Sequence, residues 1–225
     1  MAHSEPLPSK QVTLAGKHVL VTAGPTHEPI DPVRLIANRS SGRQGFAIAA
    51  AAAKAGARVT LIAGPVALEA DKGIDRVDVE TAEQMAEAVF AALPADAAIL
   101  VAAVADWRVA PSSTKLKKGA GPPKLEFLPT RDILAELGVS EQRPLLLVGF
   151  AAETGHVVEQ GIAKRQAKNS DWIVANDVSG DVMGGHRNRV HLLTAQGVED
   201  WPEASKEDVA EKLIERIAEA LSLIA

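Results

Sequence analysis

Residues 18–56 of this chain read HVLVTAGPTHEPIDPVRLIANRSSGRQGFAIAAAAAKAG, and the arrangement of the rest follows from this stretch. It opens with HVLVTA, a short apolar run that predicts a buried strand. It closes with FAIAAAAAKAG, which is apolar on nearly every side and ends in a glycine, so we expect a buried helix at 42–56. Residues 24–45 between them are rich in glycine, proline, serine and charged side chains. That composition predicts a loop that holds a polar group.

The rest of the chain continues to alternate strands with helices. Apolar runs bounded by turn residues predict strands at 58–63, 76–79, 96–103, 125–128, 144–150, 172–175 and 189–194, the last in an edge hairpin. Apolar periodicity and capping residues predict helices at 81–92, 132–137 and 156–169, and a last helix that opens at Ser205 and Asp208. We expect 105–123 to be a mobile loop without a regular pattern. This order predicts an α/β fold, a doubly wound and mainly parallel sheet with helices on both faces.

The polar segments of the chain follow the predicted strands. They come after residues 23, 103, 150 and 175, where four of the apolar runs end. In doubly wound sheets, ligands bind beyond the carboxyl ends of the strands. We therefore expect these four loops to meet at one edge of the sheet and to form a single site.

The composition limits the classes of function. The chain has 225 residues, a net charge of −5 and no cysteine. The acidic balance gives no electrostatic case for nucleic acid or for a membrane surface, and no apolar run is long enough to span a bilayer. The lack of cysteine excludes disulfides, thiolate catalysis and Cys-ligated metals, and fits a cytoplasmic protein. Residues 1–15 lack the apolar core of a signal peptide, so we expect a linker or tag remnant there, followed by a single domain at 16–225.

The cluster SSGRQG at 40–45 offers two interpretations that stay open. It is either a phosphate site at the N-terminus of a helix, with Gly42 and Gly45 allowing close approach, or a tight turn capped by serines. It differs from the dinucleotide fingerprint, since the glycines do not follow the first strand at once and no acidic residue ends the second strand. It lacks the Gly-Lys-Ser/Thr of a Walker loop.

Other polar residues are candidates on chemistry alone. Asp106 follows a strongly apolar strand, and the downstream lysines of KLKK, from Lys115, suit a polyphosphate; the alternative is a solvated charge cluster. Lys164 and Lys168 share one helix face, although the helix dipole alone favours cations there. Asn38 could hold an oxyanion or form a turn. Arg34 is in the same way either an anion clamp or a surface ion pair.

The histidines and serines show no metal or hydrolase pattern. The six histidines have no HExxH or other ligand spacing, and no GxSxG motif is present. We expect neither a structural metal nor a metal-ligating residue set.

Four motifs in order resemble one family. They are GPTHEPIDPVRLIANRSSGRQG, then AAVADWR with KLKK downstream, then VGFAAET, then KRQAKNSDWIVANDV. Together they resemble phosphopantothenoylcysteine synthetase, which in many bacteria is the C-terminal half of a bifunctional coenzyme A biosynthesis protein. The other half of that protein is a flavin-dependent decarboxylase. The resemblance implies a Rossmann-like fold over about residues 16–221, which agrees with the predicted sheet.

The resemblance also implies a two-step ligase. The carboxylate of 4′-phosphopantothenate attacks the α-phosphate of CTP, releasing pyrophosphate and leaving an acyl-cytidylate. The amine of L-cysteine then forms the amide and releases CMP. Mg²⁺ is expected with the triphosphate, held mostly by phosphate oxygens and water. A homodimer is implied, and flavin is expected only in a fused decarboxylase partner.

The resemblance assigns roles to individual residues. Asn38 lies near the acyl-cytidylate carbonyl, Lys115 is needed to form the cytidylate, and Arg34 reaches the substrate phosphate across a dimer interface. Asp106 joins the catalytic set, and Ala102 and Ala103 touch both substrates. The remaining nucleotide-binding positions are Gly24, Ser40, Gly42, Gly45, Leu100, Val101, Arg131, Asp132, Ile133, Leu134, Phe150, Lys164, Lys168 and Asn176.

Two other classes of function stay open. One is an NAD(P)-dependent reductase, which the displaced glycines and the absence of tyrosine disfavour. The other is a non-catalytic nucleotide-binding module, which would bind nucleotide without releasing pyrophosphate.

Overall fold

The computed structural model describes residues 13–119, 121, 123–177 and 187–224. The expected linker at 1–15 therefore lies mostly outside the described residues. Leu14 is an exception, because its side chain is fully buried in the core and its N–H donates to the Ala55 carbonyl at 2.9 Å. The prediction of a linker up to residue 15 is wrong at that end, since burying Leu14 ties the chain to the sheet before the first strand.

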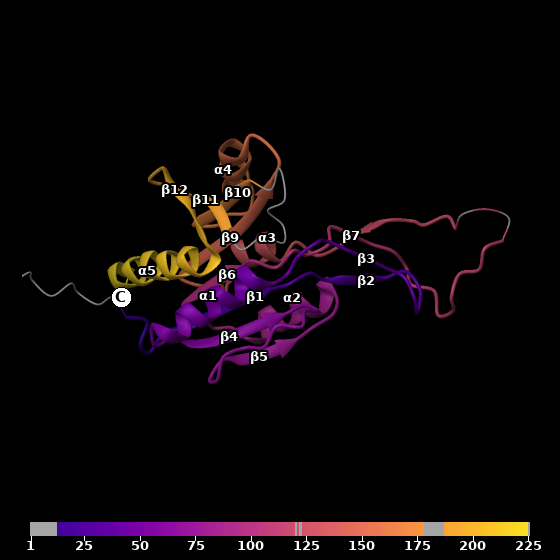
Figure 1. Cartoon of the computed structure of the whole chain (residues 1–225), viewed down its shortest axis with the longest axis horizontal. Coiled ribbons are helices and arrows are strands. Elements are labelled where there is room, and N and C mark those ends of the chain that lie inside the picture. Colours follow the sequence, from indigo (N-terminus) through magenta and orange to yellow (C-terminus); the bar gives the residue numbers. More distant parts are fainter. Residues whose placement is uncertain (1–12, 120, 122, 178–186, 225) are drawn as a thin grey trace, which may run out of the picture.

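Within the described residues, eight strands form one sheet (Figure 1). Their bounds are His18–Ala23 (β1), Arg58–Ala63 (β4), Asp75–Asp78 (β5), Ala97–Leu100 (β6), Leu146–Glu153 (β9), Trp172–Asp177 (β10), Arg187–Leu193 (β11) and Val198–Ser205 (β12). The sheet order is β12-β11-β10-β9-β6-β1-β4-β5. The strands from β10 to β5 are parallel, and β11 and β12 add an antiparallel hairpin. The predicted doubly wound fold and its late hairpin are confirmed.

The order of the parallel strands creates a crevice beside β1. The chain builds outward from β1 to β4 and β5, then returns to the other side of β1 and builds outward through β6, β9 and β10. The connections on the two sides of β1 therefore leave in opposite directions. Ligands bind at such a switch point, beyond the carboxyl ends of the strands.

Helices cover both faces of the sheet because the strands alternate their side chains. On β1, Val19 and Val21 face one apolar cluster, which includes Ile48 and Leu213, while Leu20 faces a second cluster around Met85. The first cluster holds Arg43–Lys54 (α1) and Lys206–Ile224 (α5). The second holds Ala82–Ala91 (α2), Ile133–Gly138 (α3) and Val157–Ala167 (α4). The alanine-rich α1 is buried between the sheet and α5, as its all-round apolar sequence predicts.

A long arm departs from the body of the molecule (Figure 1). It contains the hairpin of His27–Pro29 (β2) and Leu35–Ala37 (β3), and the pair Trp107–Arg108 (β7) and Leu128–Pro129 (β8). The prediction that 24–45 and 105–123 hold only loop is therefore wrong. These strands are two or three residues long, too short to show a period of two in the sequence.

Other boundaries differ by a few residues. The strand expected at 96–103 ends at Leu100, where the backbone turns to bond with β1, and the strand expected at 144–150 runs on to Glu153. The helix α3 is capped by Asp132, whose carboxylate accepts from the Ala135 N–H at 3.0 Å, and begins three residues after Thr130.

Candidate functional site

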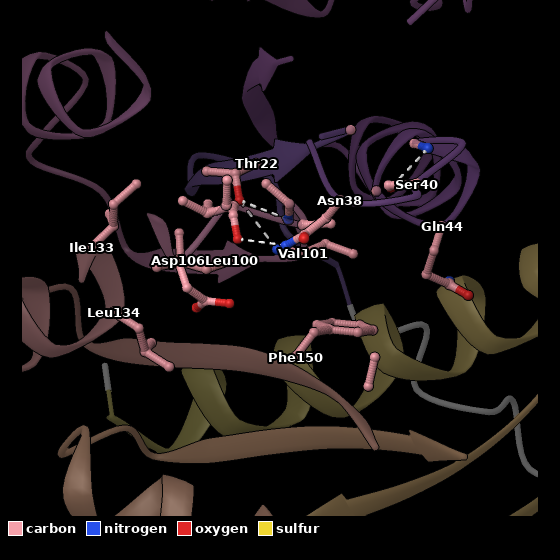
Figure 2. Close-up of a pocket in the computed structure, with 18 of the residues that line it drawn as sticks. Thr22, Asn38, Ser40, Gln44, Leu100, Val101, Asp106, Ile133, Leu134 and Phe150 are labelled. Atoms are coloured by element: carbon pink, nitrogen blue, oxygen red, sulfur yellow. Dashed lines mark hydrogen bonds between the residues drawn. The ribbon is translucent and has the colours of Figure 1, made fainter. Parts of the chain in front are cut away.

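A cleft of about 950 Å³ opens at the carboxyl edge of the sheet, beside the switch point between β1 and β6. It is lined by the segments that follow β1 and β6, by residues of β9 and β10 themselves, and by the N-terminus of α1 (Figure 2). The predicted convergence on one edge is confirmed for the segments after residues 23 and 103. After residues 150 and 175, the lining residues Ala152 and Asn176 belong to strands and not to loops. The site is open to solvent, and its size suits a nucleotide.

The glycine-serine cluster forms the entry to α1. Gly42 is the N-cap, with φ of 74°, and no side chain among the described residues caps the helix there. A Cβ on Gly45 would lie 2.5 Å from the Ala23 Cβ, so this glycine lets α1 pack directly on the end of β1. The uncapped N–H groups at the start of α1 border the cleft, which favours an anion.

The end of β1 fixes the segment that follows β6. The Thr22 hydroxyl, 2% exposed, accepts hydrogen bonds from Val101 N–H at 3.1 Å and Ala102 N–H at 3.2 Å. The Ala103 N–H donates to the Gly24 carbonyl at 2.9 Å. Residues 100–103 are therefore a rigid wall whose backbone lines the cleft.

Asn38 and Asp106 face the same open space from two loops (Figure 2). The Asn38 amide donates to the Val104 carbonyl at 2.9 Å, which holds the loop after β3 against the loop after β6. The Asp106 carbonyl accepts from Thr130 N–H at 3.1 Å, which anchors Asp106 at the base of the arm. Both side chains are exposed to the cleft and available to a ligand.

The opposite wall carries Phe150, Lys164 of α4 and Lys168, the residue just after the C-terminus of that helix. The half-buried ring of Phe150 projects into the cleft (Figure 2), and the Lys164 ammonium donates to the Phe150 carbonyl at 2.8 Å. Burial lowers the pKa of Lys164. The Lys168 ammonium pairs with the Asp132 carboxylate. Burial acts to raise the pKa of Asp132, but hydrogen bonds from Lys168 and the Ala135 N–H outweigh it, so this pKa lies below its usual range.

Arg131 lies in the lining, but its guanidinium is already bound. It pairs with Glu136 and with Glu83 at 3.1 Å, and it packs over the Phe90 ring. The hydrogen bonds that Arg131 donates to Glu136 raise the pKa of Arg131 further. The geometry gives this arginine a structural task, tying the loop before α3 to α2.

Basic side chains outnumber acidic ones in the lining. Six are Lys or Arg and two are Asp, namely Arg39, Arg43, Arg131, Lys164, Lys168 and Lys206 against Asp106 and Asp132. The whole chain has a net charge of −5, so the charge of the cleft lining is opposite in sign to the charge of the whole chain. A basic cleft in an acidic protein selects an anionic ligand.

The comparisons with known proteins agree with this geometry. The family model described as DNA/pantothenate metabolism flavoprotein C-terminal domain matches residues 14–221. The chain belongs to this family.

Individual relatives show how much of this chain is similar to known proteins. The coenzyme A biosynthesis bifunctional protein CoaBC of Bacillus subtilis (strain 168) is 45% identical over 213 residues, covering 91% of this chain and 52% of that protein. A crystal structure of the C-terminal domain of CoaBC is 38% identical with a TM-score of 0.80, covering 95% of this chain and 99% of that one. The resemblance in four motifs is confirmed. The chain spans about half the length of the curated relatives it matches.

A more distant structure shares the fold. A Cab2 mutant in complex with phosphopantothenate-cysteine is 17% identical with a TM-score of 0.73, covering 92% of this chain and 88% of that one. At this identity the likeness concerns the fold alone.

The cleft of this family member brings together most of the predicted site residues. The residues that line it include Gly24, Asn38, Ser40, Gly42, Gly45, Leu100, Val101, Ala102, Ala103, Asp106, Arg131, Asp132, Ile133, Leu134, Phe150, Lys164, Lys168 and Asn176. Arg34 and Lys115 lie outside the lining, on the arm. The Arg34 guanidinium pairs with Asp31 at 2.9 Å and donates to the Leu116 carbonyl at 2.5 Å, which places it next to Lys115.

Sequence reasoning missed several lining residues, among them Thr22, Gln44, Asn188 and Lys206. Thr22 ends a strand and Gln44 opens a helix, so position alone could have indicated them. Asn188 and Lys206 lie in the last quarter of the chain and reach the cleft only through the antiparallel hairpin. No local pattern marks them.

Two further searches covered the described part of the chain only. No cluster of three or more His, Cys, Asp or Glu side chains there could hold a metal ion. None of its helices is both long enough and apolar enough to cross a membrane.

Proposed function

We propose that this chain is a ligase domain of coenzyme A biosynthesis that joins 4′-phosphopantothenate to L-cysteine with CTP. In the first step, the substrate carboxylate attacks the α-phosphate of CTP and pyrophosphate leaves. In the second, the cysteine amine attacks the acyl-cytidylate carbonyl, the C–N bond forms and CMP leaves. Neither step needs a protein nucleophile, so positioning and charge neutralisation supply the catalysis.

The observation that carries this proposal is the basic cleft at the switch point of a chain that belongs to this family. Three of its features suit a nucleotide: the open N-terminus of α1 for phosphates, the ring of Phe150 for a base, and the lysines at the C-terminal end of α4 for charge. The bifunctional relatives act in coenzyme A biosynthesis by name, and the distant Cab2 structure holds phosphopantothenate-cysteine. Both support the choice of substrates.

Individual residues then take separate tasks. The Asn38 amide, held at the cleft by the Val104 carbonyl, is placed to polarise the acyl-cytidylate carbonyl. Asp106 and Lys115 serve the first step, in which the charge of the triphosphate must be neutralised as it leaves. The fixed backbone of residues 100–103 gives both substrates a rigid wall.

Mg²⁺ fits this cleft as a companion of the triphosphate. The lining offers Asp106 as a carboxylate without a hydrogen-bond partner among the described residues, whereas Asp132 is taken by Lys168. One carboxylate with phosphate oxygens and water is the usual setting for nucleotide-bound Mg²⁺. Bound there, the ion would neutralise phosphate charge.

The arm supports a homodimer. It exposes large apolar side chains, with Val33 63%, Trp107 54% and Phe127 54% exposed. Such side chains gathered on one projection are typical of a surface that a partner covers. A second copy of the chain would place Arg34 and Lys115 near a cleft, which neither residue lines in its own subunit. Fusion to a flavin-dependent decarboxylase is the arrangement that the half-length match to bifunctional relatives supports.

The test is a two-stage assay. The chain is incubated with CTP, Mg²⁺ and 4′-phosphopantothenate, with and without cysteine, and pyrophosphate and the amide product are measured. We expect pyrophosphate in both cases and 4′-phosphopantothenoyl-cysteine only with cysteine. Nucleotide binding without pyrophosphate release would contradict the ligase proposal and favour a non-catalytic nucleotide-binding module. The structure does not support the reductase alternative. β4 ends at Ala63 and is followed by Gly64-Pro65, without an acidic residue to bind a ribose.

A further inference from the structure

One end of the cleft holds a buried lysine that forms no ion pair within the described residues, although the charge of the neighbouring Glu207 acts on it. Lys206, the first residue of α5, is 6% exposed and lines the cleft. Among the described residues, no hydrogen bond or ion pair reaches its ammonium group. A buried, unpaired cation is costly unless an anion joins it. Burial lowers the pKa of Lys206, and the positive charge of Arg43 lowers it further.

Two amide side chains beside Lys206 also have unused hydrogen-bonding atoms. Asn188 is 6% exposed, and its Oδ1 has no partner in the described part of the chain. The Oε1 of Gln44 is likewise without one, while its Nε2 donates to the Lys206 carbonyl at 3.1 Å. Buried polar atoms are nearly always satisfied, so unsatisfied ones in a cleft mark a place for water or a ligand. Both residues line the cleft next to Lys206.

The fold brings these residues to one point from three elements. Gln44 lies in the first turn of α1, whose N-terminus no described side chain caps, and Figure 2 shows it directed away from Asn38 toward α5. Asn188 is the second residue of β11, which is antiparallel to β10 and therefore starts at the edge where β10 ends. Lys206 follows the end of β12. A helix N-terminus, the ammonium group of Lys206 and two amides make a binding site for a phosphoryl group.

We propose that Lys206, Asn188 and Gln44 form, with the N-terminus of α1, a subsite that binds the terminal phosphates of the nucleotide and retains them as pyrophosphate leaves. The nucleotide is favoured over the phosphate ester of the second substrate because the subsite is continuous with residues 40–45 at the mouth of α1. The assignment of this subsite to the phosphates of CTP rests on the proposed function. The expectation that the subsite binds inorganic pyrophosphate does not depend on the proposed function.

The experiment measures binding by titration calorimetry to the full chain and its Lys206→Gln variant. The probes are inorganic pyrophosphate, CTP, CMP and 4′-phosphopantothenate. We expect the variant to bind pyrophosphate and CTP about 10- to 100-fold more weakly, the usual result of losing a hydrogen bond to a charged group, and to bind CMP as the wild type does. Lys54→Gln is the control, because it removes the same charge from an exposed position on α1.

A second readout separates binding from folding. Removing an unpaired buried charge should leave the melting temperature of the ligand-free chain unchanged or raise it, while the stabilisation by pyrophosphate is lost. Asn188→Ala should also weaken pyrophosphate binding. A lower melting temperature for ligand-free Lys206→Gln, unchanged pyrophosphate affinity, or an equal loss in Lys54→Gln would overturn the subsite. Weakening confined to 4′-phosphopantothenate would overturn the assignment to the nucleotide.

The two proposals fail separately. If Lys206→Gln weakens CTP but wild type releases no pyrophosphate from CTP and 4′-phosphopantothenate, the ligase proposal is wrong and the subsite stands. If the wild type turns over and Lys206→Gln has the wild-type KM for CTP as well as its affinity for pyrophosphate, the subsite is wrong and the ligase stands.

Discussion

Asn38 is the residue whose replacement separates the two half-reactions most cleanly. Its amide is held by a single hydrogen bond to the Val104 carbonyl and is otherwise exposed to the cleft. Asn38→Asp keeps the size but places a negative charge where the carbonyl of the acyl-cytidylate should gain electron density. We expect pyrophosphate release to persist, while amide formation falls by about 100-fold or more.

The measurement is pyrophosphate and amide product in the same reaction. Gln142→Glu is a suitable control, because it makes the same amide-to-carboxylate change at an exposed position outside the cleft lining. Equal loss of both products in Asn38→Asp would contradict the role in the second step.

The lowered pKa of Asp132 predicts how the stability of the fold depends on pH. Its pKa in the folded chain lies below the usual value, because hydrogen bonds from Lys168 and the Ala135 N–H outweigh burial. A carboxyl with a depressed pKa stabilises the folded state above its unfolded pKa and loses that contribution as pH falls through the folded pKa. Asp132→Asn keeps a cap for α3 and removes the charge. Since the side chain is 46% exposed, we expect a cost of only about 0.5–1 kcal/mol at pH 7.

That cost should shrink to nothing as the pH falls below the usual aspartate range. The check is urea unfolding of wild type and Asp132→Asn at several pH values between neutral and acid. A difference in unfolding free energy that does not vary with pH would show that the Lys168–Asp132 pair contributes nothing.

At the scale of elements, the contact between α1 and β1 determines the position of the helix N-terminus. A Cβ at Gly45 would meet the Ala23 Cβ at 2.5 Å and the Thr22 carbonyl oxygen at 3.1 Å, both on the end of β1. Gly45→Ala must therefore push α1 away from the sheet. We expect a loss of about 1–3 kcal/mol in unfolding free energy, typical of overpacking, and weaker CTP binding because the N–H groups move.

Thermal unfolding and CTP titration test this prediction. Gly119→Ala is the matched control, since a Cβ there meets no atom within 4 Å and its φ is not positive. A stable Gly45→Ala variant with normal CTP affinity would mean that α1 tolerates displacement.

At the scale of the whole molecule, the arm separates Arg34 from the cleft of its own subunit. The Arg34 guanidinium is held to the arm by Asp31 and the Leu116 carbonyl. In the proposed homodimer, Arg34 of one copy serves the cleft of the other. Arg34→Met and Asn38→Asp chains, each deficient in amide formation, should when mixed regain about a quarter of the wild-type rate of amide formation, because half of the dimers are mixed and each has one intact site.

The activity of the mixture, after exchange of subunits, is the readout. Tagged wild-type chains report whether subunits exchange. Exchange without recovered activity would mean that Arg34 acts in its own subunit or does not act at all.

Local patterns predicted the elements that are held by local contacts. The capping boxes of Thr81 with Gln84 and of Ser205 with Asp208 are present at the starts of α2 and α5. The buried stripe of α5, including Val209, Leu213 and Ile217, follows its helical spacing. The two-residue strand β7 could not be predicted, because its pairing with β8 joins residues about 20 apart with no periodic signal. The strand expected at 125–128 overlaps β8 only at Leu128.

The sequence by itself determined the doubly wound sheet, the edge that carries the site and most of the residues around it, since strand and helix periodicities and strand-end loops are local properties. Only the tertiary structure decided which charged and polar side chains lie close to one another. It places Arg34 and Lys115 on an arm, binds the guanidinium of Arg131 to glutamates, and brings Lys206 and Asn188 into the cleft from the far end of the chain. Contacts between residues so far apart in the sequence depend on the paths of loops and the order of strands, which are fixed by packing over the whole molecule.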